Sequence, residues 1–203
     1  PVNDAPSLDA LADAAVDEDG VYSLELSGAD VDGDALTFQA SVDGNGSVDI
    51  DGSTLVVTPS EDFNGNIVVS VLATDGQASG SGSFTLTVNP VNDAPVLSAI
   101  ANQSIDEDNH LEISIFGNDI DGDELVYSAV ALDNATASID GNTLTVIPDE
   151  NYNGDVVVSV AVTDSLLTSS TTFTLTVAPV NDAPSLDALA DAAVDEDGVY
   201  SLE

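Results

Sequence analysis

The sequence contains no lysine and no arginine. Its 203 residues carry 38 acidic side chains and a single histidine, which gives a formal net charge of −38 at pH 7. Binding to nucleic acid or to an anionic membrane surface depends on basic side chains. The composition therefore excludes nucleic-acid partners. Because no carboxylate can pair with a lysine or arginine, we expect solvent cations or bound metal to compensate the acidic side chains.

Cysteine, methionine and tryptophan are also absent. Their absence excludes disulfides, thiolate metal sites and thiol nucleophiles, and it leaves oxygen ligands for hard cations. No apolar run reaches the roughly 18 residues of a membrane span, so we expect no membrane insertion. Nothing at the N-terminus reads as a signal peptide. Hydrophobic residues still make up 43% of the chain, enough for a packed core.

Internal repeats define the organisation of the chain. The hexapeptide Pro-Val-Asn-Asp-Ala-Pro occurs three times at a spacing of 89 residues, and residues 179–203 match residues 1–25 at every position. We expect a long array with proline-stiffened linkers, in which a two-domain unit of 178 residues is itself duplicated. The expected parts are linkers at 1–6, 90–95 and 179–184, a first repeat at 7–89, a second repeat at 96–178 and the truncated start of a third at 185–203.

Within each repeat, apolar and polar residues alternate with period two, the pattern of strands with one buried face. Residues 67–73 are apolar on both faces and predict a central strand, and a first strand is expected near 8–16. Segments 48–50 and 55–57 predict a hairpin around Asp51-Gly52. About seven strands per repeat, without a helical stretch, predict an all-β fold of tandem seven-stranded Greek-key sandwiches of the immunoglobulin type, arranged as a rod.

The acidic residues cluster where the strand pattern stops. The first repeat has Asp17-Glu18-Asp19, Asp30-Val31-Asp32-Gly33-Asp34 and a lone Asp75, and each cluster recurs 89 residues later. Glu61 and its counterpart Glu150 form a fourth position. Carboxylates a few ångströms apart repel one another unless a divalent cation lies between them, and calcium takes six to eight oxygen ligands from flexible loops. Ordinary turn formation by Asp-Gly is the alternative interpretation.

These motifs resemble the bacterial cadherin-like domains that occur in tandem in large surface adhesins. The matching residues are Glu18 and Glu107 for the acidic residue after the first strand, Asp30 with Asp32 and Asp119 with Asp121 for the Asp-x-Asp motif, Asp75 and Asp164 for the strand-end Asp, and Pro90-Val91-Asn92-Asp93-Ala94 for the linker. The linker departs from the family pattern at Pro90 and Ala94, so we expect one or two ions at a junction rather than three.

The resemblance implies calcium (Ca²⁺) between successive domains. The implied ligands are Glu18, Glu61, Asp62, Asn92, Asp93, Asp119, Asp121 and Asp164. The equivalent partial sites are Asn3, Asp4, Asp30, Asp32, Asp75, Glu107, Glu150, Asn181 and Asp182. His110, which aligns with Val21, is expected to be a partly buried strand residue rather than a ligand.

The implied function is a calcium-rigidified extender of an extracellular bacterial adhesin, at the cell surface or secreted, that spaces a terminal binding domain from the cell. Its partners would be neighbouring repeats of the same long chain, with a carbohydrate or cell-surface ligand bound by other domains. Two alternatives stay open: a calcium-dependent carbohydrate- or cell-binding module, and a subunit of an extracellular fibre with a 178-residue repeat. Catalysis is not expected, because the chain has nine aromatic residues, no tryptophan and one histidine.

Overall fold

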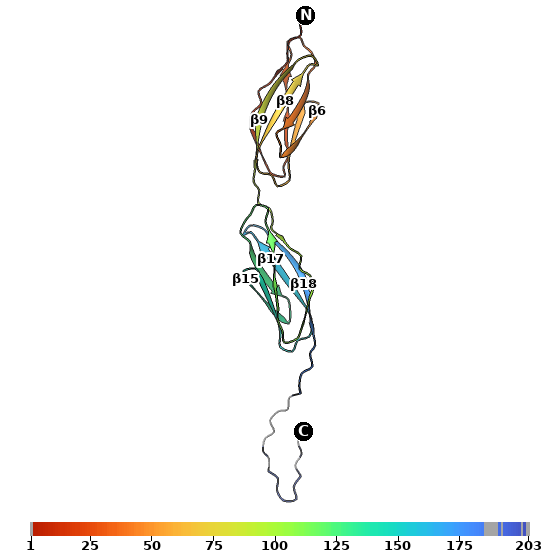
Figure 1. Cartoon of the computed structure of the whole chain (residues 1–203), viewed down its shortest axis with the longest axis vertical. Coiled ribbons are helices and arrows are strands. Elements are labelled where there is room, and N and C mark those ends of the chain that lie inside the picture. Colours follow the sequence, from red (N-terminus) through yellow and green to blue (C-terminus); the bar gives the residue numbers. More distant parts are fainter. Residues whose placement is uncertain (1, 185–190, 192, 200, 202–203) are drawn as a thin grey trace. The chain divides into compact units, whose positions relative to one another are not determined.

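The computed structural model describes residues 2–184, 191, 193–199 and 201 (Figure 1). The chain divides into two compact units. The first comprises Pro1–Leu97, Gly117–Val126 and Val162–Ser169, and the second comprises Ser98–Phe116, Tyr127–Ala161 and Ser170–Glu203. Every regular element in the described residues is a β-strand. Nothing helical among them has the length and apolarity of a membrane span.

The first repeat is a sandwich of a four-stranded and a three-stranded sheet. Its strands are β1 (Ser7–Leu8), β2 (Ala14–Asp17), β3 (Tyr22–Glu25), β4 (Gly28–Ala29), β5 (Thr37–Val42), β6 (Gly46–Asp51), β7 (Thr54–Pro59), β8 (Gly65–Thr74) and β9 (Ser79–Asn89). The sheet orders are β2-β9-β8-β5 and β3-β7-β6, and β1 pairs with β4 separately. β2 runs parallel to β9, whereas the other pairs are antiparallel. Strands adjacent in a sheet are mostly not consecutive in sequence, as in a Greek key.

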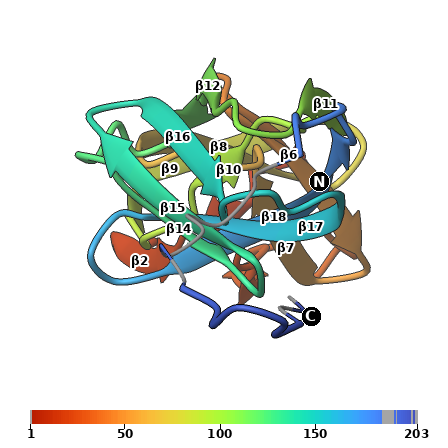
Figure 2. The same ribbon diagram turned by 90° about the horizontal axis from the view of Figure 1, so that it is seen from below.

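The second repeat has the same topology. Its strands are β10 (Val96–Leu97), β11 (Gln103–Asp106), β12 (Leu111–Ser114), β13 (Gly117–Asn118), β14 (Val126–Ala131), β15 (Ala135–Asp140), β16 (Thr143–Pro148), β17 (Gly154–Thr163) and β18 (Thr168–Ala178). The sheet orders are β11-β18-β17-β14 and β12-β16-β15, with β10 paired to β13. Figure 2 shows the neighbouring strands β15 and β16 of this repeat side by side. The prediction of tandem all-β sandwiches is thereby confirmed.

Each core is built from the inward residues of the two sheets. In the first repeat Leu55 and Val57 of β7 face Ile67 and Val69 of β8, and all four are fully buried. The Tyr22 and Phe84 rings pack at 5.8 Å between centroids. The segment 67–73, apolar on both faces in the sequence, is nevertheless one-sided, because Val68 is 41% exposed. Because strand residues fill the cores, the loops at the sheet ends can carry polar side chains.

Two sequence expectations are wrong. The single strand expected near 8–16 is two strands, because β1 pairs antiparallel with β4 whereas β2 pairs in parallel with β9. In the connection between them, the Asp13 carboxylate accepts the backbone N–H of Thr85 at 2.7 Å. His110 is exposed and precedes β12 rather than lying in a strand. Of the expected third repeat, residues 185–190, 192, 200, 202 and 203 lie outside the described residues.

Candidate metal centre

A buried glutamate anchors the linker to the first repeat. Glu18 follows β2 and is 6% exposed, and its backbone N–H donates to the Asn89 carbonyl at 2.9 Å. Its Oε1 accepts the backbone N–H of Val91, and its Oε2 accepts the Asn64 amide at 3.5 Å. One carboxylate thus holds the first residues of the linker next to the loop that ends at Asn64.

The linker residues after Val91 are held by the acidic loops of the second repeat. The Asn92 side-chain amide donates to Asp164 Oδ2 at 2.8 Å, and the Asp93 backbone N–H donates to Asp121 Oδ2 at 2.9 Å. These residues, together with Glu18, all belong to the first compact unit. The linker is therefore fixed from both of its ends by hydrogen bonds to carboxylates.

The loop after β13 presents three carboxylates on alternate residues. Asp119 Oδ1 accepts the backbone N–H groups of Asp121 at 3.0 Å and Asp123 at 3.4 Å. Gly122 between them has a φ of 80°, a left-handed conformation that glycine adopts without strain. This turn directs the side chains of Asp119, Asp121 and Asp123 to one place, where their carboxylate oxygens lie within 4.8 Å of one another.

Three such groups of carboxylates lie side by side in this unit. They are Glu18 with Asp93 and Asp121, Asp19 with Asp62 and Asp93, and Asp119 with Asp121 and Asp123. Within each group one oxygen of every residue lies within 4.8 Å of the others. Asp93 belongs to the first two groups and Asp121 to the first and the third. The linker carboxylate of Asp93 is therefore shared between neighbouring positions.

The pKa values of Asp93 and Asp164 are shifted in opposite directions. Removal from water raises the pKa of Asp93 above its ordinary value, and the charges of Asp62, Asp121, Asp19 and Glu18 raise it further. Hydrogen bonds hold the pKa of Asp164 below its ordinary value, chiefly the one from the Asn92 amide and then those from the Leu167 and Leu166 N–H groups. Asp93 thus lies among negative charges that no positive group compensates, whereas N–H donors stabilise Asp164 in its ionised form.

The donor set fits a hard divalent cation. Asp93 Oδ2 and Asp119 Oδ2 are buried and have no hydrogen-bond partner, and Asp119 as a whole is only 9% exposed. Burying a carboxylate oxygen with neither a hydrogen-bond donor nor a cation beside it lowers the free energy of unfolding. The ligands offered are all oxygen, the type that calcium and magnesium prefer and zinc does not. Flexible loops suit calcium better than the stricter octahedral geometry of magnesium.

Most residues singled out in the sequence converge here. Glu18, Asp62, Asp93, Asp119 and Asp121 enter the carboxylate groups. Asn92 and Asp164 bond to each other beside them, with both Asp164 oxygens already engaged. Glu61 is exposed and, among the described residues, joins none of these groups.

Sequence reasoning missed Asp19 and Asp123. Both lie in the acidic clusters that the sequence had marked, one residue after Glu18 and two residues after Asp121. The pattern located these clusters but did not show which members would turn inward. That the converging residues hold metal remains a prediction.

The predicted equivalent positions repeat parts of this geometry. At the start of the first repeat, Asn3 donates to Asp75 Oδ2 at 2.9 Å and the Asp4 N–H donates to Asp32 Oδ2 at 2.9 Å. The Asp30 Oδ2 atom is buried without a hydrogen-bond partner, like that of Asp119. The start of the first repeat therefore repeats the hydrogen bonds seen around Asn92, Asp93 and Asp119.

The end of the second repeat reproduces the Glu18 anchor. Glu107 is 5% exposed and accepts the Val180 N–H at 2.6 Å and the Asn153 amide at 3.3 Å. Asn181 donates to the Asp182 carbonyl at 3.1 Å. Glu150, like Glu61, is exposed. The same linker conformation thus recurs in the second copy.

Comparison with known proteins identifies the family of the chain and structures with a similar fold. The family model described as the bacterial Ig domain matches residues 3–89 and again residues 92–178. No curated protein sequence matches the chain. Human protocadherin-24 EC1-2 is 18% identical over 88% of this chain and 100% of that one, with a TM-score of 0.60. Drosophila N-cadherin EC1-4 is 18% identical over 88% of this chain and 50% of that one, with a TM-score of 0.55.

An endo-fucoidan hydrolase from glycoside hydrolase family 107 is also similar, at 18% identity and a TM-score of 0.39. The alignment covers 87% of this chain but only 29% of the hydrolase. At this level of identity the cadherin structures support the fold of the tandem domains and nothing more specific.

Proposed function

The chain belongs to the bacterial Ig domain family, and we propose that it is a calcium-rigidified extender segment of an extracellular adhesin. The observation that carries the proposal is the position of Asp93. This linker carboxylate lies within 4.8 Å of Glu18 from the first repeat and of Asp121 from the second, and one of its oxygens is buried without a donor. A single cation there would be held by both repeats and by the linker between them.

Calcium would supply the positive charge that the chain itself lacks. Glu18, Asp93 and Asp121 would hold one ion, and the neighbouring groups around Asp62 and Asp119 offer further positions. Binding to the folded state stabilises it by RT ln(1 + [Ca²⁺]/Kd), about 1.4 kcal/mol when calcium exceeds Kd by tenfold. Extracellular calcium in the millimolar range suits the weak affinity class of such modules, with Kd of about 10⁻⁴ to 10⁻³ M.

The calcium ligands would stiffen the linker because they come from the first repeat, the linker and the second repeat. The linker of six residues is framed by Pro90 and Pro95, which restrict but do not abolish its freedom. An ion bound by Glu18, Asp93 and Asp121 would remove the remaining hinge motion. In a long array this would let successive repeats, the partners of this segment, project a terminal binding domain away from the cell surface. The role proposed here is mechanical and not catalytic.

A second candidate is a subunit of an extracellular fibre. It is favoured by the complete identity of residues 179–203 with residues 1–25, which marks a repeating unit of 178 residues. A calcium-dependent carbohydrate- or cell-binding module has less support. Phe63 packs against the core and the Tyr152 hydroxyl bonds to the Asp155 carbonyl at 3.0 Å, so these loop aromatics have structural roles.

Small-angle scattering with and without calcium tests the extender proposal. We expect calcium to narrow the distribution of interdomain distances and EDTA to broaden it. The variant Asp93→Ala with Asp119→Ala and Asp121→Ala should stay broad in calcium while its sandwiches remain folded.

The matched control is Asp49→Ala with Asp51→Ala and Asp140→Ala. It removes three exposed carboxylates from the three-stranded sheets. The control should behave like the unaltered chain. A calcium-insensitive profile of the unaltered chain, or a triple variant as stiff as the control, would refute the proposal.

A further inference from the structure

One of the three carboxylate groups at the first linker draws no residue from the second repeat. It consists of Asp19 and Asp62, from two loops of the first repeat, and of Asp93 from the linker, with one oxygen of each within 4.8 Å of the others. The other two groups both include Asp121 of the second repeat. The group around Asp62 can therefore be compared with its counterpart at the next linker without regard to the repeat that follows.

The counterpart of this group has the same loop and lacks one carboxylate. The residues 89 positions later are Asp108, Asn151 and Asp182. The Asn151 N–H donates to Asp108 Oδ1 at 3.4 Å, as the Asp62 N–H donates to Asp19 Oδ1 at 3.4 Å. Asp62 and Asn151 both have a φ of 54°. An amide thus replaces a carboxylate in a loop whose backbone is unchanged.

The linker also has the same local structure at both places. The Asn92 amide donates to the Asp93 carbonyl at 3.0 Å, and the Asn181 amide donates to the Asp182 carbonyl at 3.1 Å. In the part of the chain that the structure describes, no group of three carboxylates forms at the second linker. Within the group that needs no following repeat, the chemical difference between the two linkers is therefore residue 151.

The Asp62 carboxylate acts strongly on the linker. Removal from water raises the pKa of Asp93 most, and among the neighbouring charges that of Asp62 raises it most. The Asp93 Oδ2 atom is buried and has no hydrogen-bond partner. An asparagine in place of Asp62 would offer an oxygen without charge, and the charge of the ligand set tunes calcium affinity. Asp62 and its counterpart Asn151 therefore decide how strongly this group attracts a divalent cation.

We propose that the two linkers have unequal calcium capacity, and that the first binds one more cation, held by Asp19, Asp62 and Asp93. This inference rests on the proposed calcium role of the linkers. Residues 179–203 match residues 1–25 at every position, so the third repeat begins as a copy of the first. In an array of 178-residue units the two kinds of linker would alternate. Every second linker would then be held less firmly to the repeat before it.

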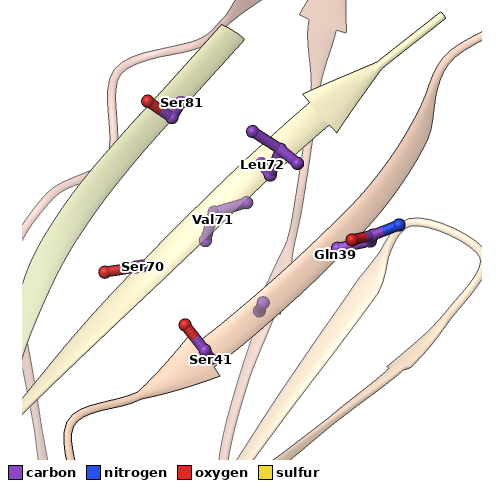
Figure 3. A pocket seen from close by; sticks show the side chains of 7 residues that line it. Gln39, Ser41, Ser70, Val71, Leu72 and Ser81 are labelled. Carbon is purple, nitrogen blue, oxygen red and sulfur yellow. The ribbon is translucent and has the colours of Figure 1, made fainter. Parts of the chain in front are cut away.

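The outer face of the first repeat carries a hollow that should add no calcium ion. This shallow hollow of about 290 Å³ lies on the four-stranded sheet and is lined by Gln39, Ser41, Ser70, Leu72 and Ser81 among others (Figure 3). None of its lining residues carries a charge, so it provides no carboxylate ligand. We therefore expect the number of bound ions to depend on the acidic loops and not on this hollow.

A gain of calcium at the second linker tests the proposal. Equilibrium dialysis at about 1 mM free calcium counts the ions bound per chain. Asn151→Asp completes a group with Asp108 and Asp182, and it should raise the bound calcium by about one ion. The matched control is Asn142→Asp, which makes the same change at an exposed turn between β15 and β16. The control should bind as many ions as the unaltered chain.

The reverse substitution should lose an ion at the first linker. Asp62→Asn should lower the bound calcium by about one ion in the same dialysis experiment. Asp51→Asn removes an equal charge from the exposed end of β6 and should leave the number of bound ions unchanged. Circular dichroism verifies that each variant is folded.

Terbium luminescence locates the added ion. Tyr152 directly follows residue 151, and a tyrosine ring transfers excitation energy to a terbium ion bound close to it. Asn151→Asp should therefore increase tyrosine-excited terbium luminescence, and Asn151→Asp with Tyr152→Phe should lose this increase. The first repeat has Phe63 at the equivalent position, so phenylalanine suits this loop.

The outcomes separate this inference from the proposed function. If the unaltered chain binds calcium but Asn151→Asp gains no ion, or Asp62→Asn loses none, relative to their controls, the inference is overturned and the proposed function stands. A terbium signal that survives Tyr152→Phe would also overturn the inference, because the added ion would lie elsewhere. An unaltered chain without saturable calcium binding would overturn both.

Discussion

The Asp119 side chain shows how a carboxylate can be placed by its own loop and still lack a partner. One oxygen caps the turn through the Asp121 and Asp123 N–H groups, and the other is buried without a donor. Folding therefore leaves a negative oxygen in a poorly solvated position. A bound cation would compensate this cost, which links the local turn to the proposed binding function.

Replacing Asp119 tests this residue directly. Asp119→Asn keeps an oxygen that can accept the turn hydrogen bonds but removes the negative charge from the site. We expect calcium affinity to fall by about tenfold or more, equivalent to about 1.4 kcal/mol. Asp140→Asn removes an equal charge from an exposed position on β15 and serves as the control. Equal calcium affinities of the two variants in titration calorimetry would place the ion elsewhere.

Asp93 should make calcium-free stability depend on pH. Its pKa in the folded chain is raised above the ordinary 3.8, chiefly by desolvation and then by its acidic neighbours. The folded state therefore binds its proton more tightly, so this group favours folding at low pH and opposes it as pH rises through the folded pKa.

In EDTA, Asp93→Asn should thus become more stable relative to the unaltered chain as pH increases above 3.8. In excess calcium the order should reverse at neutral pH, because the variant lacks a ligand. Thermal melts over pH 3.5–7 measure both effects. A stability difference that does not change with pH would contradict the charge argument.

At the scale of elements, the loops before β8 and β17 have the same backbone and different chemistry. The Asp62 N–H donates to Asp19 Oδ1 at 3.4 Å, and the Asn151 N–H donates to Asp108 Oδ1 at 3.4 Å. Both residues have a φ of 54°. Only the first loop has a carboxylate at this position, because the equivalent residue of the second loop is Asn151.

This difference predicts that the Asp62 carboxylate raises the calcium affinity of the first linker, whereas Asn151 adds no charge at the equivalent position. Asp62→Asn should weaken calcium binding at the first linker, since charge in the ligand set tunes affinity. Glu61→Gln, one residue earlier and exposed, is the matched control and should bind calcium as the unaltered chain does. Titration calorimetry compares the two variants, and a larger loss of affinity from Glu61→Gln than from Asp62→Asn would place the ligand at Glu61.

Much of each element could be predicted from the sequence. Period-two patterning indicated strands throughout each repeat, residues 67–73 lie within β8 as predicted, and the Asp51-Gly52 turn identified the β6–β7 hairpin. Local patterning could not reveal that residues 8–16 divide between two sheets, because that depends on pairing with β4 and with β9. The 89-residue repeat located the acidic loops, but the choice between Glu61 and Asp62 depends on a backbone conformation with positive φ that no spacing rule gives.

At the scale of the whole molecule, the acidic clusters lie in the loops at the sheet ends. Outward carboxylates also occur on the three-stranded sheets, as at Asp49 and Asp140, and on the four-stranded sheets, as at Asp106 and Asp155. With no basic residue, the chain depends on external cations for compensation.

The most direct test of the account is titration of the calcium-free chain with calcium in a calorimeter, followed by thermal melts in calcium and in EDTA. The account predicts saturable binding and a higher melting temperature in calcium, and it predicts that Asp93→Asn with Asp121→Asn loses most of both effects. The absence of saturable binding in the unaltered chain, or the same binding and melting shift in the double variant, would contradict it.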